Sequence, residues 1–315
     1  MDAAFAEERG MERDRLPAVA LILFCKRGMP GAVPHADEST SSTACSARSA
    51  RFARPEVVTT PTPTHRSARE DPLSLADGWL QVVSTRHASP RDDVDRSRPG
   101  LELVLLDMDG TLIDASSWEM IHEAFGVSNQ HNWEAYQRGE LDDVEFMRSD
   151  IALWHVGREA VHVDELERIL HTAPLMPGAR ELVEGLRSRG IATCIVSGGI
   201  DLLARHVCLE LGIDMYVANG LRLQESGHLS GEGIVYLEIR DKARTTREIL
   251  RKLGVPKERT AAVGNSAYDA PMFREAGFGV AVNPSDPVVR RAARHVVEGK
   301  DLRLVLRHLL SHEDA

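Results

Sequence analysis

The feature that most constrains this chain is an apolar segment, residues 101–106, that ends abruptly on two carboxylates and a glycine, Asp107, Asp109 and Gly110. A short apolar run closed by a turn predicts a strand buried on both faces, as in parallel sheets covered by helices. Ligands bind at the carboxyl ends of such strands. Two acids there can share a divalent cation and divide nucleophile and acid–base roles, although a simple Asp-Gly turn fits this segment equally well.

Residues 179–310 alternate between expected helices and strands, which predicts an α/β fold with a parallel sheet and right-handed crossovers. The expected helices are 179–188, 201–211, 242–253, 270–276, 287–293 and 302–310. The expected strands are 191–196, 215–218, 260–263 and 279–282, with a β-hairpin in 221–236. Before them, residues 116–171 have helical spacing and hold three of the four tryptophans, which favours the core of a small helical subdomain over a substrate-binding cluster.

Residues 1–100 lack sustained periodicity and are rich in Ala, Arg, Ser, Thr and Pro. Such a stretch buries too little apolar surface to offset chain entropy, so we expect a disordered extension or a stretch upstream of the true start. The apolar run 16–25 weakly resembles part of a secretory signal. Acidic residues precede it and no clear cleavage pattern is present, so we expect a cytoplasmic protein.

Charge and cysteine usage limit the partners. Residues 1–100 hold 14 acidic and 14 basic side chains, so the net charge of -10 falls entirely on residues 101–315. An acidic folded part argues against nucleic acid or an anionic membrane as a partner. No apolar stretch approaches the about 18 residues that span a bilayer. The four cysteines, which lack metal-type or redox-type spacing, are interpreted as free thiols of a reducing compartment.

Two further segments place phosphate-binding groups at the edge of the sheet where Asp107 is expected. Ser197 and Gly198 end the second strand, and the helix that follows offers backbone donors at its N-terminus. Lys242 stands in the first turn of a helix capped by Asp241, where a cation opposes the helix dipole. An uncompensated local conflict of this kind indicates function. The alternatives are ordinary turn residues at 197–198 and a solvated surface lysine at 242.

A last segment, residues 264–269, runs from a strand into a loop and a helix. Asn265 and Asp269 supply oxygens that suit Mg²⁺, which takes few protein ligands and keeps several waters. Asp269 also fits the N-cap of the helix that follows, because a proline stands early in that helix. All four segments lie at carboxyl ends of expected parallel strands, so we expect them to form one site.

Together these segments resemble the haloacid dehalogenase superfamily of phosphohydrolases, in its phosphoserine-phosphatase-like branch. Residues 107–112 resemble the first motif of that family, Ser197 the second, Lys242 the third and residues 264–269 the fourth. The resemblance covers residues 101–310 and none of the first 100. It implies a Rossmann-like parallel sheet core flanked by helices, formed by residues 101–113 and 176–312, with a small helical cap inserted at residues 114–175.

The resemblance also implies a reaction on a small phosphorylated metabolite. Asp107 would attack phosphorus and form an aspartyl-phosphate, while Asp109 protonates the leaving oxygen and later activates water. Ser197, the Gly198 N–H and Lys242 would bind the phosphoryl oxygens. The cofactor would be Mg²⁺, and the cap would exclude bulk water. Phosphoryl transfer to a second sugar hydroxyl would use the same nucleophile.

The Mg²⁺ ligands implied by the family are the Asp107 carboxylate, the Asp109 backbone carbonyl and the fourth motif with Asn265 and Asp269. That motif usually begins Gly-Asp, whereas this chain has Gly264-Asn265. A neutral amide in place of a carboxylate weakens cation binding, so we expect activity with a raised Mg²⁺ requirement. The alternative is a catalytically impaired relative that binds a phosphorylated ligand or partner.

The cap departs from the family as well. Phosphoserine phosphatases carry a Glu after the first motif that grips the substrate ammonium, and a later Arg that pairs with its carboxylate. Here Ser116 stands at the Glu position and Asp150 near the Arg position, with Glu119 and Arg148 close by as substitutes. A changed charge pattern opposes recognition of a zwitterion. Phosphoserine is the leading named substrate, and another small phosphomonoester fits as well.

Overall fold

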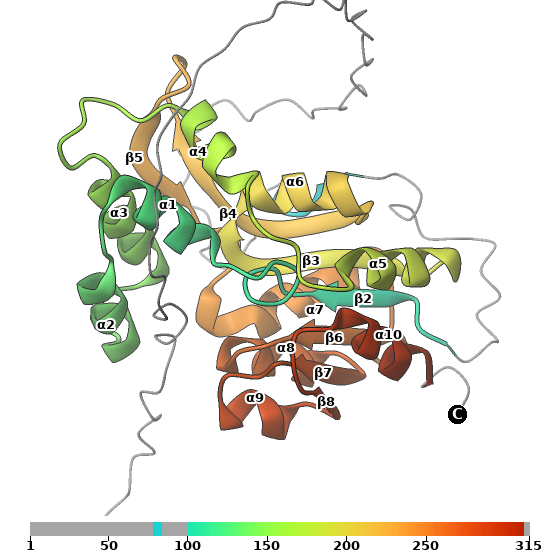
Figure 1. Cartoon of the computed structure of the whole chain (residues 1–315). Helices are drawn as coiled ribbons and strands as arrows, with labels where there is room; N and C mark the ends of the chain where they lie inside the picture. The colour runs from blue at the N-terminus through green and yellow to red at the C-terminus, as the bar shows by residue number, and fades with distance from the viewer. Residues whose placement is uncertain (1–77, 84–99, 312–315) are drawn as a thin grey trace, which may run out of the picture. The chain divides into compact units, whose positions relative to one another are not determined.

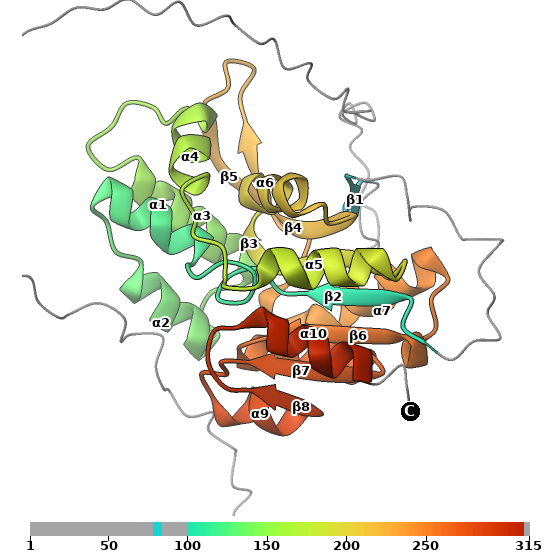
Figure 2. The same ribbon diagram turned by 45° about the vertical axis from the view of Figure 1, so that its right-hand side comes forward.

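The computed structural model describes residues 78–83 and 100–311, all within one compact unit, Pro55–Ala315. The centre of this unit is a sheet with the strand order β1-β4-β3-β2-β6-β7-β8 (Figure 1, with β1 labelled in Figure 2). Neighbouring strands from β4 to β8 are parallel, whereas β1 and β5 each pair antiparallel with β4. The strands are β1 (Gln81–Val82), β2 (Leu103–Leu106), β3 (Ala192–Ile200), β4 (Met215–Leu223), β5 (Leu229–Ile234), β6 (Thr260–Gly264), β7 (Phe278–Val282) and β8 (His295–Val297).

Helices cover both faces of the sheet (Figure 2). One face packs against α5 (Ala179–Ser188), α6 (Asp201–Leu211) and α10 (Leu302–Ser311). The other face packs against α7 (Lys242–Leu253), α8 (Ala270–Glu275) and α9 (Pro287–Ala292). This arrangement confirms the predicted α/β fold with a parallel core.

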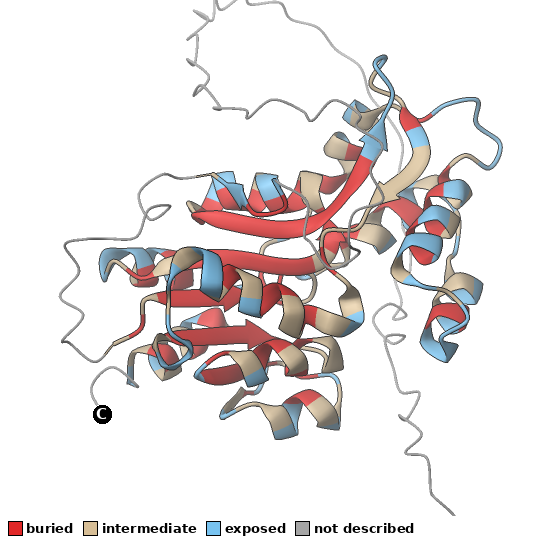
Figure 3. Ribbon diagram, turned by 180° about the vertical axis from the view of Figure 1, so that it is seen from behind, coloured by how far each residue is buried: buried red, intermediate tan, exposed pale blue. Residues whose placement is uncertain are grey.

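Strand β2 lies between two hydrophobic clusters, which explains its unbroken apolar sequence. Val104 and Leu106 belong to the cluster under α5, α6 and α10, and Leu103 and Leu105 belong to the cluster under α7, α8 and α9. All four side chains are fully buried, as are most residues of the neighbouring strands (Figure 3). Because both faces of the strand are covered, alternation between apolar and polar residues is absent here.

Four helices follow β2 and precede α5: α1 (Ser117–Phe125), α2 (Gln130–Arg138), α3 (Asp143–Trp154) and α4 (Val163–Leu170). Helix α1 begins after Ser116, whose hydroxyl accepts from the Glu119 N–H, and α3 begins with a capping box between Asp142 and Glu145. Trp154 is fully buried, and Trp118 stacks on it with ring centroids 5.4 Å apart. These two tryptophans therefore pack in the core of the helical region.

The predicted β-hairpin is formed by the end of β4 and by β5. The two strands pair antiparallel, and β5 packs against α3 (Figure 1). The Asn219 side chain fixes the return to the sheet, because its oxygen accepts from the backbone N–H groups of Tyr236 and Leu237. The hairpin thereby joins the inserted helices to the edge of the sheet.

Two strands were not predicted from the sequence. Strand β8 has three residues and β1 only two, and segments this short carry no periodicity. Strand β1 falls in the stretch expected to be disordered, yet Trp79 and Leu80 beside it are buried against the sheet. Residues 1–77 and 84–99 of that stretch, with the apolar run 16–25, lie outside the described residues.

The described residues bear on the expected absence of membrane spans and on the expected free thiols. Within residues 78–83 and 100–311, no helix is long and apolar enough to cross a membrane. Cys194 and Cys208 are free and buried, which agrees with the interpretation of free thiols. Cys25 and Cys45 lie outside the described residues.

Leu105→Ala tests the burial of β2. We expect the free energy of unfolding to fall by about 2–5 kcal/mol, because the change leaves a cavity between the sheet and α7 to α9. Leu209→Ala is the matched control, since Leu209 is 53% exposed on α6 and its loss should change stability by less than about 0.5 kcal/mol. Urea unfolding measures both, and equal losses would contradict this packing.

Candidate active site

The site lies at the carboxyl ends of three adjacent strands. Strand β2 pairs with β3 on one side and β6 on the other, so Leu106 lies opposite both Ile195 and Val263. Asp107 follows directly, and its N–H donates to the Val263 carbonyl at 2.9 Å. The parallel register therefore brings the ends of the first, second and fourth motifs together at one edge of the sheet, as the sequence predicted.

Lys242 joins three of these segments. As the first residue of α7, it follows Asp241, whose side chain caps the helix. Its Nζ donates to Asp107 Oδ1 and Asp269 Oδ1, both at 2.7 Å, and to the Val196 carbonyl at 3.1 Å. The lysine is only 3% exposed, so it is not a solvated surface side chain. Burial alone lowers the pKa of Lys242, but the two carboxylates raise that pKa above its ordinary value and keep the lysine charged.

The two aspartates of the first motif have different surroundings. Burial raises the pKa of Asp107, and the charge of Asp269 raises it further, while Lys242 lowers it. Burial raises the pKa of Asp109 to about 7, against hydrogen bonds from Ser117. Asp109 Oδ1 is buried and has no hydrogen-bond partner among the described residues. A carboxyl group that holds a proton near neutral pH suits general acid catalysis, whereas the lysine-paired Asp107 suits nucleophilic attack.

The second motif interrupts strand β3. The pairing of β3 with β4 shifts between Val196 and Ile200, and within this irregularity the Ser197 hydroxyl accepts from the Gly199 N–H at 3.1 Å. A Cβ at Gly198 would lie 2.7 Å from Ile239 Cγ1, so only glycine fits there without a shift. Helix α6 begins directly after this segment, which places its N-terminus at the same edge.

In the fourth motif, the Asp269 side chain turns back onto its own loop. Its Oδ2 accepts from the N–H groups of Asn265 and Ser266, both at 2.9 Å, and from the Ser266 hydroxyl. Asp269 holds the N-cap position of α8 but makes no side-chain capping bond to that helix. The predicted N-cap position is therefore confirmed, although the side chain closes a capping box with Ser266 around the 3-10 turn Ala267–Asp269 instead of bonding to α8.

The predicted Mg²⁺ ligands converge in part. The Thr111 hydroxyl lies 3.2 Å from Asp107 Oδ2 and 3.4 Å from Asn265 Oδ1, so these two oxygens flank one point. Carboxylate, amide and backbone carbonyl oxygens of this kind fit Mg²⁺. Both Asp269 oxygens are already held, by Lys242 and by the loop. Across the described ranges, no group of three or more His, Cys, Asp or Glu residues is arranged to hold a metal ion.

The cap residues that the sequence singled out differ in burial and in their partners. Ser116 caps α1, and Asp150 is buried, where it accepts from the side chains of Asn129 and Asn132. Arg148 is exposed and pairs with Glu232 of β5 at 2.9 Å. Glu119 is exposed on α1. The arginine expected to replace the family's substrate contact therefore has a carboxylate partner of its own.

Sequence reasoning missed three residues at the site. Ser117 donates its N–H and its hydroxyl to Asp109 Oδ2, and the Trp118 Nε1 donates to the Gly198 carbonyl at 3.2 Å. Thr111 links the first and fourth motifs. The adjacent serines 116 and 117 were the available signal, but the sequence does not say which of them caps the helix and which turns inward.

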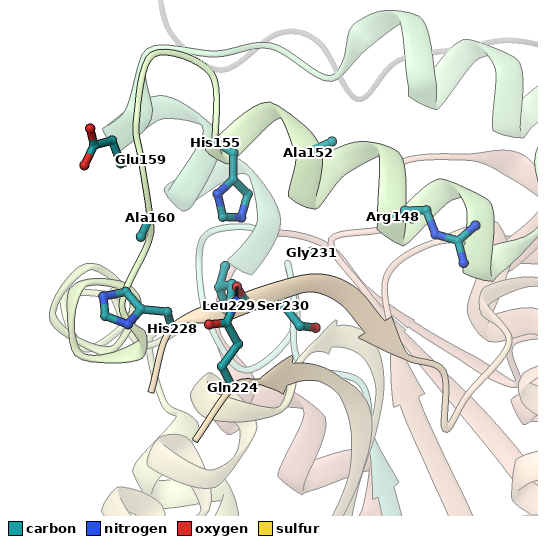
Figure 4. A pocket seen from close by; sticks show the side chains of 10 residues that line it. All are labelled: Arg148, Ala152, His155, Glu159, Ala160, Gln224, His228, Leu229, Ser230 and Gly231. Atoms are coloured by element: carbon teal, nitrogen blue, oxygen red, sulfur yellow. Dashed lines mark hydrogen bonds between the residues drawn. The ribbon is translucent and has the colours of Figure 1, made fainter. Parts of the chain in front are cut away.

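A separate pocket of about 550 Å³ lies between α3, the segment before α4, and the β-hairpin (Figure 4). Arg148, His155, Gln224 and His228 are among its lining residues. None of the predicted catalytic, phosphate-binding or metal-binding residues lines it. This pocket is therefore distinct from the site built by the four motifs.

Residues 101–277 match the haloacid dehalogenase-like hydrolase family. The chain belongs to this family. The phosphoserine phosphatase of Idiomarina loihiensis is 31% identical over 210 residues, which cover 65% of this chain and 91% of the relative. The phosphoserine phosphatase of Wolinella succinogenes is 31% identical over 66% of this chain and 100% of the relative. That of Archaeoglobus fulgidus is 34% identical over 58% of this chain and 53% of its own length, so the chain spans about half of that protein.

Solved structures agree with this placement. A structure described as a phospho-aspartyl intermediate analogue of phosphoserine phosphatase has a TM-score of 0.58 and 27% identity, covering 67% of this chain and 99% of that one. A substrate-bound phosphoserine phosphatase complex has a TM-score of 0.57 and 26% identity, covering 66% and 98%. The comparisons confirm the resemblance to the phosphoserine-phosphatase-like branch and support a phosphatase.

Asp109→Asn tests the raised pKa of the Asp109 carboxyl. The pKa of Asp109 is raised from 3.8 to about 7, so between these values the folded state keeps a proton that the unfolded state has lost. The stability that this group contributes is complete below pH 3.8 and is lost as the pH rises to about 7. Asparagine does not titrate, so the variant does not lose stability in this way. Urea unfolding without divalent cations, from about pH 4 to about pH 8, should show a smaller decline in the variant than in the wild type. If the stabilities of the wild type and the variant fall equally with pH, the pKa of Asp109 is not raised.

Proposed function

We propose that this chain hydrolyses a small phosphomonoester with Mg²⁺ as cofactor, through an aspartyl-phosphate on Asp107. The observation that carries the proposal is the buried contact of Lys242 with Asp107 and Asp269, beside a second carboxyl, Asp109, whose pKa is raised by burial. Membership of a hydrolase family and the phosphatase relatives support the same reaction.

The residues divide the reaction into two displacements. An Asp107 oxygen attacks phosphorus, the bond between phosphorus and the leaving oxygen breaks, and that oxygen takes the proton of Asp109. Asp109 then accepts a proton from water, and the water oxygen attacks the aspartyl-phosphate to release phosphate. Ser197, the Gly198 N–H and Lys242 bind the phosphoryl oxygens and stabilise their charge.

The donor set fits Mg²⁺. Asp107, the Asp109 carbonyl and Asn265 would hold it, and the convergence of the Asp107 and Asn265 oxygens on the Thr111 hydroxyl supports this choice. Asp269, whose two oxygens bind Lys242 and the loop, would have to exchange one of these bonds to reach the ion. When bound, the ion offsets the repulsion between a carboxylate nucleophile and a phosphate dianion. Asn265 contributes no charge to the set, so the Mg²⁺ requirement is higher than with a carboxylate there.

Phosphoserine is the leading substrate, because the curated relatives of about 30% identity carry the name phosphoserine phosphatase. The cap weighs against it, since a serine and a buried aspartate, Ser116 and Asp150, stand where that substrate's charged groups are expected to bind. Another small phosphorylated metabolite is the alternative. We place the enzyme in the cytoplasm, with neither nucleic acid nor membrane as partner, in line with its acidic charge and its free thiols at Cys194 and Cys208.

A second candidate function is binding of a phosphorylated ligand or partner without efficient turnover. The amide at Asn265 favours it, because the site then lacks one of the charges that hold the cation. If this candidate is right, the protein binds a phosphorylated ligand, and any residual hydrolysis does not depend on Asp107.

Asp107→Asn separates the two candidates. Replacing the nucleophile should lower phosphate release from p-nitrophenyl phosphate by at least about 10³-fold. The wild type should lose activity in EDTA and regain it with Mg²⁺. A panel of phosphorylated metabolites that includes phosphoserine then identifies the substrate. Turnover that is equal in the wild type and the variant would remove the enzyme candidate.

Asn265→Asp tests the metal site. An added ligand charge should lower the Mg²⁺ concentration for half-maximal rate by roughly tenfold. Gln224→Glu is the matched control, because it makes the same change of charge at an exposed position of the hairpin. The measurement is a Mg²⁺ titration of turnover. If Asn265→Asp leaves both the Mg²⁺ requirement and kcat unchanged, Asn265 is not a metal ligand.

A further inference from the structure

Ser117, the first residue of α1, connects the inserted helices to the acid of the first motif. Its backbone N–H and its hydroxyl each lie 2.8 Å from Asp109 Oδ2. The Ile200 N–H, at the end of β3, donates to Ser117 Oγ at 3.0 Å. The serine is fully buried, so water does not compete for these bonds.

These contacts set the direction of the hydroxyl proton. A backbone N–H only donates, so Ile200 makes Ser117 Oγ an acceptor, and the Ser117 hydroxyl proton points to Asp109 Oδ2. Two donors therefore hold Oδ2. The other oxygen, Oδ1, is buried and has no hydrogen-bond partner within the described part of the chain. Oδ1 is thus the oxygen left to exchange a proton with a substrate.

We propose that Ser117 is a positioning residue that turns Asp109 Oδ1 toward the oxygen of the leaving group. This inference rests on the proposed function. Gly199 of the second motif packs close to both groups, since a Cβ there would lie 2.8 Å from Ser117 Oγ and 3.0 Å from Asp109 Oδ1. The bond from Trp118 Nε1 to the Gly198 carbonyl holds the next residue of α1 to the same loop. The acid is therefore oriented only when α1 is seated on the end of β3.

The role is confined to one step of the reaction. As Asp107 bonds to phosphorus, the bond between phosphorus and the leaving-group oxygen breaks. That oxygen keeps the electron pair of the bond and accepts the proton from Asp109 Oδ1. A weakly basic leaving group departs without that proton, whereas a strongly basic one needs it. The contribution of Ser117 therefore grows with the basicity of the leaving group.

The test compares two esters of similar shape, p-nitrophenyl phosphate and phenyl phosphate, by kcat/KM, which covers substrate binding and the first displacement but not the hydrolysis of the aspartyl-phosphate. Ser117→Ala should lower kcat/KM for phenyl phosphate by about 10- to 100-fold, because a misplaced catalytic group costs that much. The loss for p-nitrophenyl phosphate should stay below about threefold, since its leaving group needs little protonation. Ser117→Thr keeps the hydroxyl and should restore the phenyl phosphate rate. Ser117→Cys replaces Ser117→Ala if the alanine variant does not fold.

Thr193→Val is the matched control. Thr193 makes the same pair of bonds, from its N–H at 2.9 Å and its hydroxyl at 3.0 Å, to one carboxylate oxygen of Asp214. It does so at the amino-terminal end of β3, away from the site. Its loss should leave the ratio of the two rates unchanged. If Ser117→Ala lowers both rates equally, the serine is structural and the proposal is overturned.

The proposal is separable from the proposed function. If the wild type hydrolyses neither ester and no metabolite of the panel, the proposed function fails. Crystal structures of the wild type and of Ser117→Ala then decide the positioning role. The Asp109 carboxyl should leave its position in the variant, and an unchanged carboxyl would overturn the proposal.

Discussion

The buried contact of one lysine with two carboxylates holds the candidate site together. Lys242 Nζ bonds to Asp107 after β2, to Asp269 after β6 and to a carbonyl of β3. Each of these charged side chains would be costly to bury alone. Removing one partner from a buried ion pair lowers the free energy of unfolding by about 3–5 kcal/mol. The lysine therefore stabilises the charges that the chemistry needs and ties α7 to three strands.

The inserted helices complete the site through polar contacts rather than through the hydrophobic core alone. Ser117 holds Asp109, and Trp118 holds the second motif. On the other side, the Asp143 carboxylate accepts from the Ile239 N–H, and the Arg240 guanidinium lies 4.0 Å from the centre of the Tyr136 ring. Both contacts reach the segment just before Lys242. Movement of the inserted helices would thus shift both Asp109 and the segment that leads to Lys242.

Much of the core was predictable because its signals are local. The helices at 201–211 and 242–253 end as expected, since Gly212 and Gly254 adopt left-handed φ angles of 77° and 66° that stop a helix. Strands β1 and β8 were missed because two or three residues show no period. Asp269 takes the predicted N-cap position, but the sequence could not say that its side chain bonds to the loop, since a cap and a loop contact require the same residue type at the same place.

The sequence alone determined most of the strands and helices and the polar segments that follow β2, β3 and β6, because periodicity and end signals act over a few residues. The fourth segment was expected after a parallel strand as well, but Lys242 begins α7 after a 3-10 turn, Ile239–Asp241. The tertiary structure decided which oxygen meets which donor. Lys242 reaches Asp107 across 135 positions, and only the sheet order brings β2 between β3 and β6. The same packing buries Asp109 Oδ1 and raises the pKa of that carboxyl to about 7. Burial and long-range contacts set these properties, and neither can be read from spacing along a chain.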